Sequence, residues 1–273
     1  MKATRTVIEP PKNFTLQFSE LWQYRELFYF FTWRDIKVKY KQTYLGILWA
    51  IIQPVALMLL FTLVFSKQFS PVSGAINYKV FVLSGLILWT LFYNATSHAA
   101  ESILQQSGII KKIYFPRLII IGSALLTALF DFMIAFSIFL ILCLALGEAI
   151  SWKAIFLFPS AVMLVFLSSF GIGTLLSSLN VKYRDFRYVL PFLLQFLFFA
   201  SEVVYTISDM KHTWAKYVLS VNPVNGAIEL FRMGLNEKGD HTIILIGFLS
   251  ALTISIFGIL YFRKTEAFFA DLA

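Results

Sequence analysis

The basic residues Arg34, Lys37, Lys39 and Lys41 form the densest group of cations in the chain. They stand just before a stretch without any charge, which lasts until Lys67. Cations followed by about twenty apolar residues are typical of a chain that enters a bilayer from the cytoplasm. At that position the first chemistry expected of them is attraction of anionic lipid.

The residues needed to use a nucleotide are missing from the sequence. No GxxxxGK[ST] motif, whose backbone cradles nucleotide phosphates, occurs anywhere. Gly171, Gly173 and Thr174 lie in an apolar run without a lysine, so they suit helix packing rather than phosphate binding. The single cysteine, Cys143, excludes an internal disulfide and a cysteine-rich metal site, and we expect an inert buried thiol. A transporter with this sequence must take its energy from another polypeptide or work passively.

Asp131 is a carboxylate in the middle of a long apolar stretch. An ion-coupled carrier usually needs several ionisable groups or broken helices at this depth. A single buried carboxylate more commonly makes a hydrogen bond to a neighbouring helix, and we predict this packing role for Asp131.

Composition and hydropathy predict an all-α integral membrane protein. The chain of 273 residues is 59% hydrophobic and 14% charged, whereas soluble domains carry about 25% charged residues. The net charge of +8 is spread over short loops, so we expect no nucleic-acid partner. Apolar runs of sufficient length predict six transmembrane helices, at 45–65, 80–100, 118–146, 155–179, 189–204 and 243–262.

The positions of the basic residues predict the orientation of these spans. Sixteen of the 23 Lys and Arg residues lie in the N-terminal arm, the second and fourth loops and the C-terminal tail. Because basic loops stay on the cytoplasmic side, both termini are predicted to be cytoplasmic. We therefore expect a cytoplasmic arm at 1–44, a transmembrane domain at 45–262 and a cytoplasmic tail at 263–273.

Three segments outside the spans are predicted to form short helices. An amphipathic helix from Ser19 would lie either in the membrane interface or against the protein's own helices. Its apolar face would carry Leu21, Tyr24, Leu27, Phe28 and Phe31. Segment 205–240 holds two apolar pieces too short to span, which predicts a pair of re-entrant helices. Segment 102–113 offers either a short amphipathic docking helix at the membrane surface or an ordinary basic loop.

Four stretches of sequence carry a likeness to a known family. They are WRDIKVKYKQTYLGILWAIIQP, GIIKKIYFPR, NVKYRDFRYVLPFLLQ and NPVNGAIELFR. In this order and spacing they resemble the membrane subunits of type-2 ABC exporters, within the branch of O-antigen, capsule and teichoic-acid permeases. The likeness extends from about residue 22 to residue 262.

The resemblance implies the partners, the energy source and the substrate. Two copies of such a subunit pair in the inner membrane, and each binds a separate cytoplasmic ATPase that holds ATP and Mg²⁺. The chain itself would then be a permease without a cofactor and not an enzyme. The implied substrate is a glycan linked to an undecaprenyl carrier, and a drug or a lipid is the alternative within the same class. The residues implied to face the ATPase, in the family's coupling helix, are Ser102, Gln105, Gln106, Ile109, Ile110, Lys111 and Lys112.

Aromatic residues at helical spacing suggest a path for sugar, because the CH faces of pyranose rings stack on aromatic rings. Two groups are hypothesised to line the channel and its entrance. They are Phe192, Phe196 and Phe199 in the fifth span, and Trp33, Tyr40 and Tyr44 before the first. Packing or lipid contact is the alternative for both groups. Similarly, Lys37, Lys39 and Lys41 would attract either the pyrophosphate of a lipid-linked glycan or only anionic lipid.

Glu202 departs from the pattern of the family, which has a small residue, proline, two apolar residues and tyrosine at this point. Here the sequence reads Ser201-Glu202-Val203-Val204-Tyr205. Loss of the proline removes a kink. The carboxylate could face water or pair with a basic residue, and we assign it no role in transport.

Overall fold

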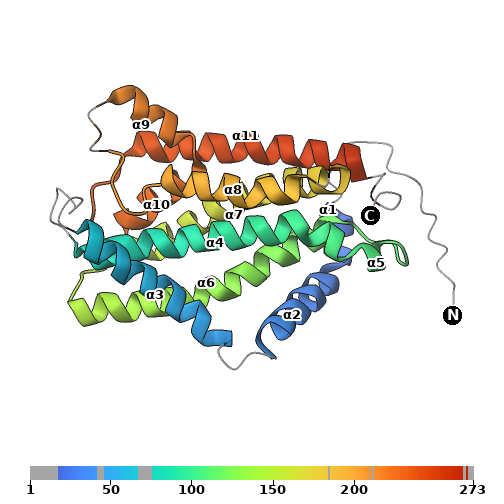
Figure 1. Cartoon of the computed structure of the whole chain (residues 1–273), viewed down its shortest axis with the longest axis horizontal. Helices are drawn as coiled ribbons and strands as arrows, with labels where there is room; N and C mark the ends of the chain where they lie inside the picture. The colour runs from blue at the N-terminus through green and yellow to red at the C-terminus, as the bar shows by residue number, and fades with distance from the viewer. Residues whose placement is uncertain are drawn as a thin grey trace.

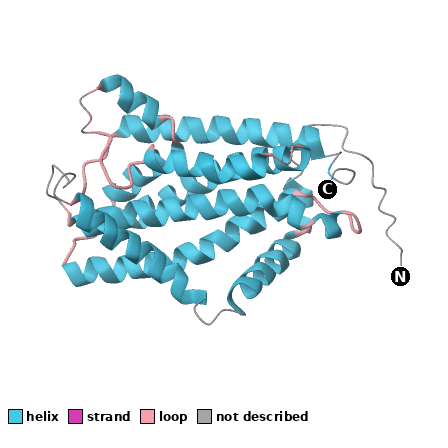
Figure 2. Ribbon diagram, in the orientation of Figure 1, coloured by secondary structure: helices cyan, strands magenta, loops and turns pink. Residues whose placement is uncertain are grey.

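The computed structural model describes residues 18–41, 46–66, 76–183, 185–208, 210, 212–266 and 269. Within these residues every regular element is a helix (Figures 1 and 2). In chain order the helices are α1 (Phe18–Gln23), α2 (Arg25–Lys41), α3 (Gly46–Phe65), α4 (Tyr78–Gln105), α5 (Ser107–Ile110), α6 (Leu118–Leu146), α7 (Ala154–Lys182), α8 (Phe186–Phe199), α9 (Thr213–Ser220), α10 (Pro223–Met233) and α11 (His241–Glu266).

Five helices of the described chain are long and apolar enough to cross a membrane, namely α3, α4, α6, α7 and α11. They coincide with five of the six predicted spans, and α6 has the predicted bounds. The remaining predicted span, 189–204, is the 14-residue helix α8, which ends at Phe199. A helix of that length reaches about 21 Å, less than the roughly 30 Å of a hydrocarbon core. The protein is therefore an all-helical, multi-pass membrane protein.

Helix α4 lies at the centre of the bundle (Figure 1). It packs against α3, α6, α7 and α10, and 78% of its most apolar window is buried inside the protein. Its first turn is capped by the Asn77 side chain, which accepts a hydrogen bond from the backbone N–H of Lys79 at 3.0 Å. Helix α8 also contacts this central helix, whereas α11 packs against α7 and α10.

Small residues bring α7 close to its neighbours, as the sequence suggested for Gly171 and Gly173. A Cβ atom at Gly171 would lie only 2.6 Å from the backbone nitrogen of Ser255 in α11. At this crossing the Ser255 hydroxyl donates a hydrogen bond to the carbonyl oxygen of Leu167 at 2.6 Å. Gly173 faces Ala99 of α4 in the same way. The expectation of close helix packing is confirmed.

The two ends of the bundle differ in their short helices (Figure 1). We call them the α5 end, where α1, α5 and the last turn of α11 lie, and the α9 end, where α9 and α10 lie. The segment predicted at 205–240 does contain two short helices. Of these, α10 is almost wholly buried among α4, α7 and α11. Asn222 caps it, because its side chain accepts from the N–H of Val224 at 3.2 Å, and Pro223 occupies its first turn.

Candidate functional site

Helix α2 packs along α6 through the apolar face predicted for the N-terminal arm. The ring of Phe28 lies directly over Gly122, where a Cβ atom would come within 2.4 Å of it. The rings of Phe31 and Phe115 are 5.7 Å apart. This face therefore contacts the protein's own helices. Tyr29 and Trp33 stack on each other on the exposed side of α2.

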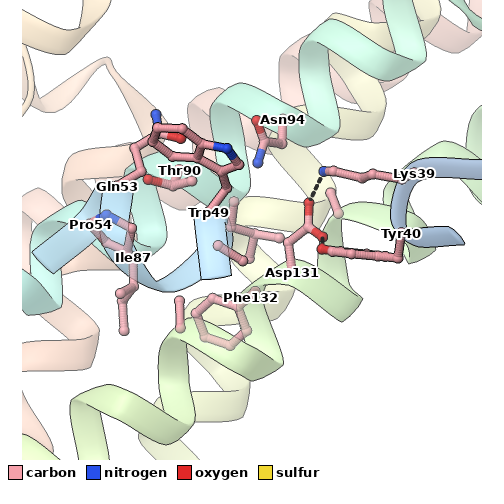
Figure 3. A pocket seen from close by; sticks show the side chains of 14 residues that line it. Lys39, Tyr40, Trp49, Gln53, Pro54, Ile87, Thr90, Asn94, Asp131 and Phe132 are labelled. Atoms are coloured by element: carbon pink, nitrogen blue, oxygen red, sulfur yellow. Dashed lines mark hydrogen bonds and ion pairs between the residues drawn. The ribbon is translucent and has the colours of Figure 1, made fainter. Parts of the chain in front are cut away.

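The last turn of α2 reaches Asp131 near the middle of α6 (Figure 3). Lys39 Nζ lies 2.5 Å from Asp131 Oδ2, and the Tyr40 hydroxyl donates a hydrogen bond to Asp131 Oδ1. The Asp131 side chain is only 9% exposed, whereas that of Lys39 is 39% exposed. The predicted hydrogen bond between Asp131 and a neighbouring helix is thus confirmed. It also joins the predicted arm at 1–44 to the bundle.

A pocket of about 140 Å³ opens beside Asp131, between α2, α3, α4 and α6. Figure 3 shows Lys39 and Tyr40 on one side of Asp131. Across the pocket are Trp49, Gln53, Thr90 and Asn94. Burial, and then the neighbouring Asp131 carboxylate, raise the pKa of Tyr40, so its phenol stays protonated and can donate. The pocket thus combines a flat indole, two amides and a hydroxyl with one ion pair.

The three lysines of α2 have different surroundings. Lys39 binds Asp131, as described above. Lys37 lies 5.1 Å from the centroid of the Trp33 ring and, with Lys41, lines an open groove along the outer face of α2. Along the sequence these lysines form one basic cluster. A helix of this length turns them toward two separate surfaces.

The two predicted aromatic groups also have different surroundings. Trp33 lines the outer groove of α2, whereas Tyr40 lines the pocket at Asp131, and Tyr44 lies outside the described residues. The structure therefore does not bring Trp33 and Tyr40 into one site. The three phenylalanines of α8 share an exposed face. Their exposed fractions are 73% for Phe192, 65% for Phe196 and 69% for Phe199.

The predicted coupling helix at 102–113 is shorter in the structure. Ser102 and Gln105 belong to the last turn of α4, because the N–H of Gln106 continues the helical ladder by bonding to the carbonyl oxygen of Ser102 at 3.1 Å. A separate helix, α5, covers only Ser107–Ile110. Ser102 and Ile110 are buried, and Ile109 packs partly against the core. Lys111 and Lys112 remain exposed.

The segment around α5 is linked directly to α2. Arg34 Nη1 donates a hydrogen bond to Gln106 Oε1 at 3.0 Å, and Arg34 is held by an ion pair with Asp35 at 2.7 Å. Since Lys39 and Tyr40 lie about one and a half turns further along α2, one rigid helix connects the α5 segment to the Asp131 pocket.

Sequence reasoning missed the burial of Arg232 in α10. This side chain is 1% exposed, and its guanidinium carbon lies 3.4 Å from the centroid of the Phe81 ring. Its Nη2 donates to the carbonyl oxygen of Glu202 at 2.8 Å. Glu202 is fully buried and does not face water. An arginine within the mostly apolar stretch 224–235, which also holds Asn225 and Glu229, was the available signal, because a buried basic group needs internal partners.

Comparison with known proteins identifies the family. The family described as ABC-2 type transporter matches residues 26–236. The chain belongs to this family. The matched part of this ABC-2 type transporter runs from α2 to the end of α10, so it contains the Asp131 pocket, the α5 segment and Arg232.

Three relatives show where the chain lies within the ABC-2 type transporters. The O-antigen export system permease protein RfbA of Myxococcus xanthus is 29% identical over 75% of this chain and 78% of its own length. The protein of the same name in Klebsiella pneumoniae is 25% identical over 88% and 92%. The polysialic acid transport protein KpsM of Escherichia coli is 25% identical over 85% and 91%.

Proposed function

We propose that this chain is the permease subunit of an ABC exporter that moves a polysaccharide outward across the inner membrane. The observation that carries the proposal is the match over most of the chain to O-antigen export system permease proteins and to a polysialic acid transport protein. These names favour a glycan over a drug or a lipid substrate. The glycan would be linked to an undecaprenyl carrier, and its pyrophosphate would meet Lys37 and Lys41 in the outer groove of α2.

In the proposed arrangement the α5 end faces the cytoplasm. This orientation is supported by the concentration of basic residues in the loops at the α5 end. Helix α8 would be the fifth of six spans in chain order, completed by the turn that follows Phe199. Helices α9 and α10 would re-enter the outer leaflet, where the surrounding helices shield the backbone of α10 from lipid. The exposed aromatic face of α2 would lie in the membrane interface.

A separate ATPase would supply the energy and would dock at α5 and the two lysines that follow it. Lys111 and Lys112 are exposed there, while Ile109 and Ile110 anchor the segment to the bundle. The bond between Arg34 and Gln106 would pass a movement of this segment to α2. ATP and Mg²⁺ would bind to the ATPase and not to this chain.

A second copy of the chain would cover the exposed faces of α3 and α8. Only 11% of the most apolar window of α3 is buried inside one chain. The phenylalanines Phe192, Phe196 and Phe199 would then line a channel between the two copies, where many weak stacking contacts suit a polymer that must slide.

The proposal is tested by complementation. The gene is deleted, the chain is supplied from a plasmid, and the surface polysaccharide is measured with antiserum or lectin. Loss of surface polysaccharide on deletion and its return with the wild-type chain are expected. A deletion strain with a normal amount of surface polysaccharide would contradict the proposal.

The docking of the ATPase is tested by charge reversal. We expect Lys111→Glu combined with Lys112→Glu to reduce co-purification of the ATPase with the tagged chain. Lys153→Glu, at an exposed position of the α9 end, is the matched control and should leave co-purification unchanged. Equal recovery of the ATPase from all three proteins would rule out docking at α5.

A further inference from the structure

Three polar side chains in the Asp131 pocket have no partner in the described protein. Gln53 projects from α3, and Thr90 and Asn94 project from adjacent turns of α4 (Figure 3). None of the three makes a hydrogen bond to another residue that the structure describes. All of them lie in membrane-spanning helices, where a polar group without a partner raises the free energy of the protein. They are therefore available to a ligand.

A polar face of α4 leads from this pocket to the α5 end. The residues of this face follow one another at intervals of three or four: Thr90, Asn94, His98, Glu101 and Gln105. At that spacing they share one side of the helix. They are exposed or half-buried, whereas the turns of α4 before Thr90 are buried. His98 lies within electrostatic reach of Asp35 and Asp131, so this face of α4 and the end of α2 look onto the same region.

The chemistry of the pocket selects among possible ligands. An anionic group such as a phosphate would meet the Asp131 carboxylate, whose partner cation Lys39 is already bound to it. An apolar molecule would leave the amides of Gln53 and Asn94 without partners. A neutral sugar offers hydroxyl groups, which both donate and accept, and a flat CH face that can stack on Trp49.

The geometry points to a saccharide-binding site formed by Trp49, Gln53, Thr90 and Asn94, approached along the polar face of α4. One neutral sugar unit of the exported polymer binds there, with its hydroxyls on the two amides and the Thr90 hydroxyl and its ring on Trp49. The ion pair between Lys39 and Asp131 holds α2 as one wall of the site. This assignment rests on the proposed function and adds a binding position on the cytoplasmic half of the path.

The test removes the polar groups and keeps the shape of the pocket. In the complemented deletion strain, a chain with Gln53→Leu, Thr90→Val and Asn94→Leu is compared with wild type and with Thr253→Val. Thr253 is exposed on α11 and bonds only to its own helix. We expect the triple variant to export about tenfold less polysaccharide, the factor given by the loss of about two neutral hydrogen bonds. Its thermal stability in detergent should equal or exceed that of wild type, because no bond within the protein is lost.

A photo-crosslinker measures contact directly. With p-benzoylphenylalanine in place of Asn94, ultraviolet light during export should attach the cell's own polysaccharide to the protein, and the same group in place of Thr253 should not. Normal export by the triple variant would overturn the assignment, as would reduced export together with reduced stability, or no adduct at position 94. If the wild-type chain fails to restore export, the proposed function itself is wrong.

Discussion

Replacing Arg232 by methionine tests whether its buried guanidinium holds α10 to the centre of the bundle. Its Nη2 donates to the carbonyl oxygens of Glu202 at 2.8 Å and of Val203 and Phe81 at 3.3 Å each. The guanidinium carbon also lies over the ring of Phe81, 3.4 Å from its centroid. Three separate segments of the chain therefore meet at one side chain.

The expected cost follows from these contacts. The hydrogen bond from the charged guanidinium to the carbonyl oxygen of Glu202 is short and contributes about 1.5–3 kcal/mol. A desolvated cation over an aromatic ring contributes about 2 kcal/mol. We expect the free energy of unfolding to fall by about 3–5 kcal/mol, which is roughly the sum of these two contributions.

Equilibrium unfolding in mixed micelles measures this cost for Arg232→Met. Arg187→Met, at an exposed position, is the control and should change stability by less than about 0.5 kcal/mol. A loss below about 1 kcal/mol for Arg232→Met would refute this account of the junction.

Two further predictions concern packing and pH. Gly171→Leu should destabilise the protein by about 1–3 kcal/mol, because the added Cβ atom would overlap the Ser255 backbone. Gly108→Ala is the control, since a Cβ atom added there would have no other atom within 4 Å. Equal melting temperatures for the two variants would contradict the close crossing of α7 and α11. Burial raises the pKa of Asp240, but bonds from Lys216 and a backbone N–H outweigh it and hold that pKa below its usual value. The resulting stability is present at neutral pH and is lost as the pH falls through the lowered pKa. Asp240→Asn should therefore lower the free energy of unfolding by up to about 1 kcal/mol near pH 7 and by less at acidic pH. An equal loss at neutral and acidic pH would contradict a stabilising ion pair between Lys216 and Asp240.

The spanning helices were predictable because hydrophobicity and length alone decide whether a helix crosses a bilayer. Helix α6 shows this, since its bounds agree with those expected from the sequence. Helix α8 ends earlier than its hydropathy predicts. Hydropathy extended it to residue 204, but it ends at Phe199, and the N–H of Glu202 bonds instead to Asn225 Oδ1 at 3.0 Å. A hydropathy average over a short window does not detect a hydrogen-bond partner 23 residues away along the chain.

The candidate site was predictable in part. The carboxylate of Asp131 was recognised as a group that needs a partner on another helix, and its partners are Lys39 and Tyr40. Lys39 and Tyr40 were not predictable as these partners. The basic residues before the first span were interpreted as a signal for membrane orientation and as contacts for anionic groups at the membrane surface. The pocket itself depends on four helices brought together by packing, which no local pattern encodes.

The contact between α2 and α6 also has a consequence for the biogenesis of the protein. Asp131 follows Lys39 by 92 residues, so the ribosome completes α2, α3 and α4 before the carboxylate exists. The end of α2 cannot settle at its final depth until α6 has entered the membrane, and until then its lysines favour the lipid headgroups. Seating of α2 is thus a late step of assembly, and a nascent chain that stops before α6 would expose a basic segment for quality control to recognise.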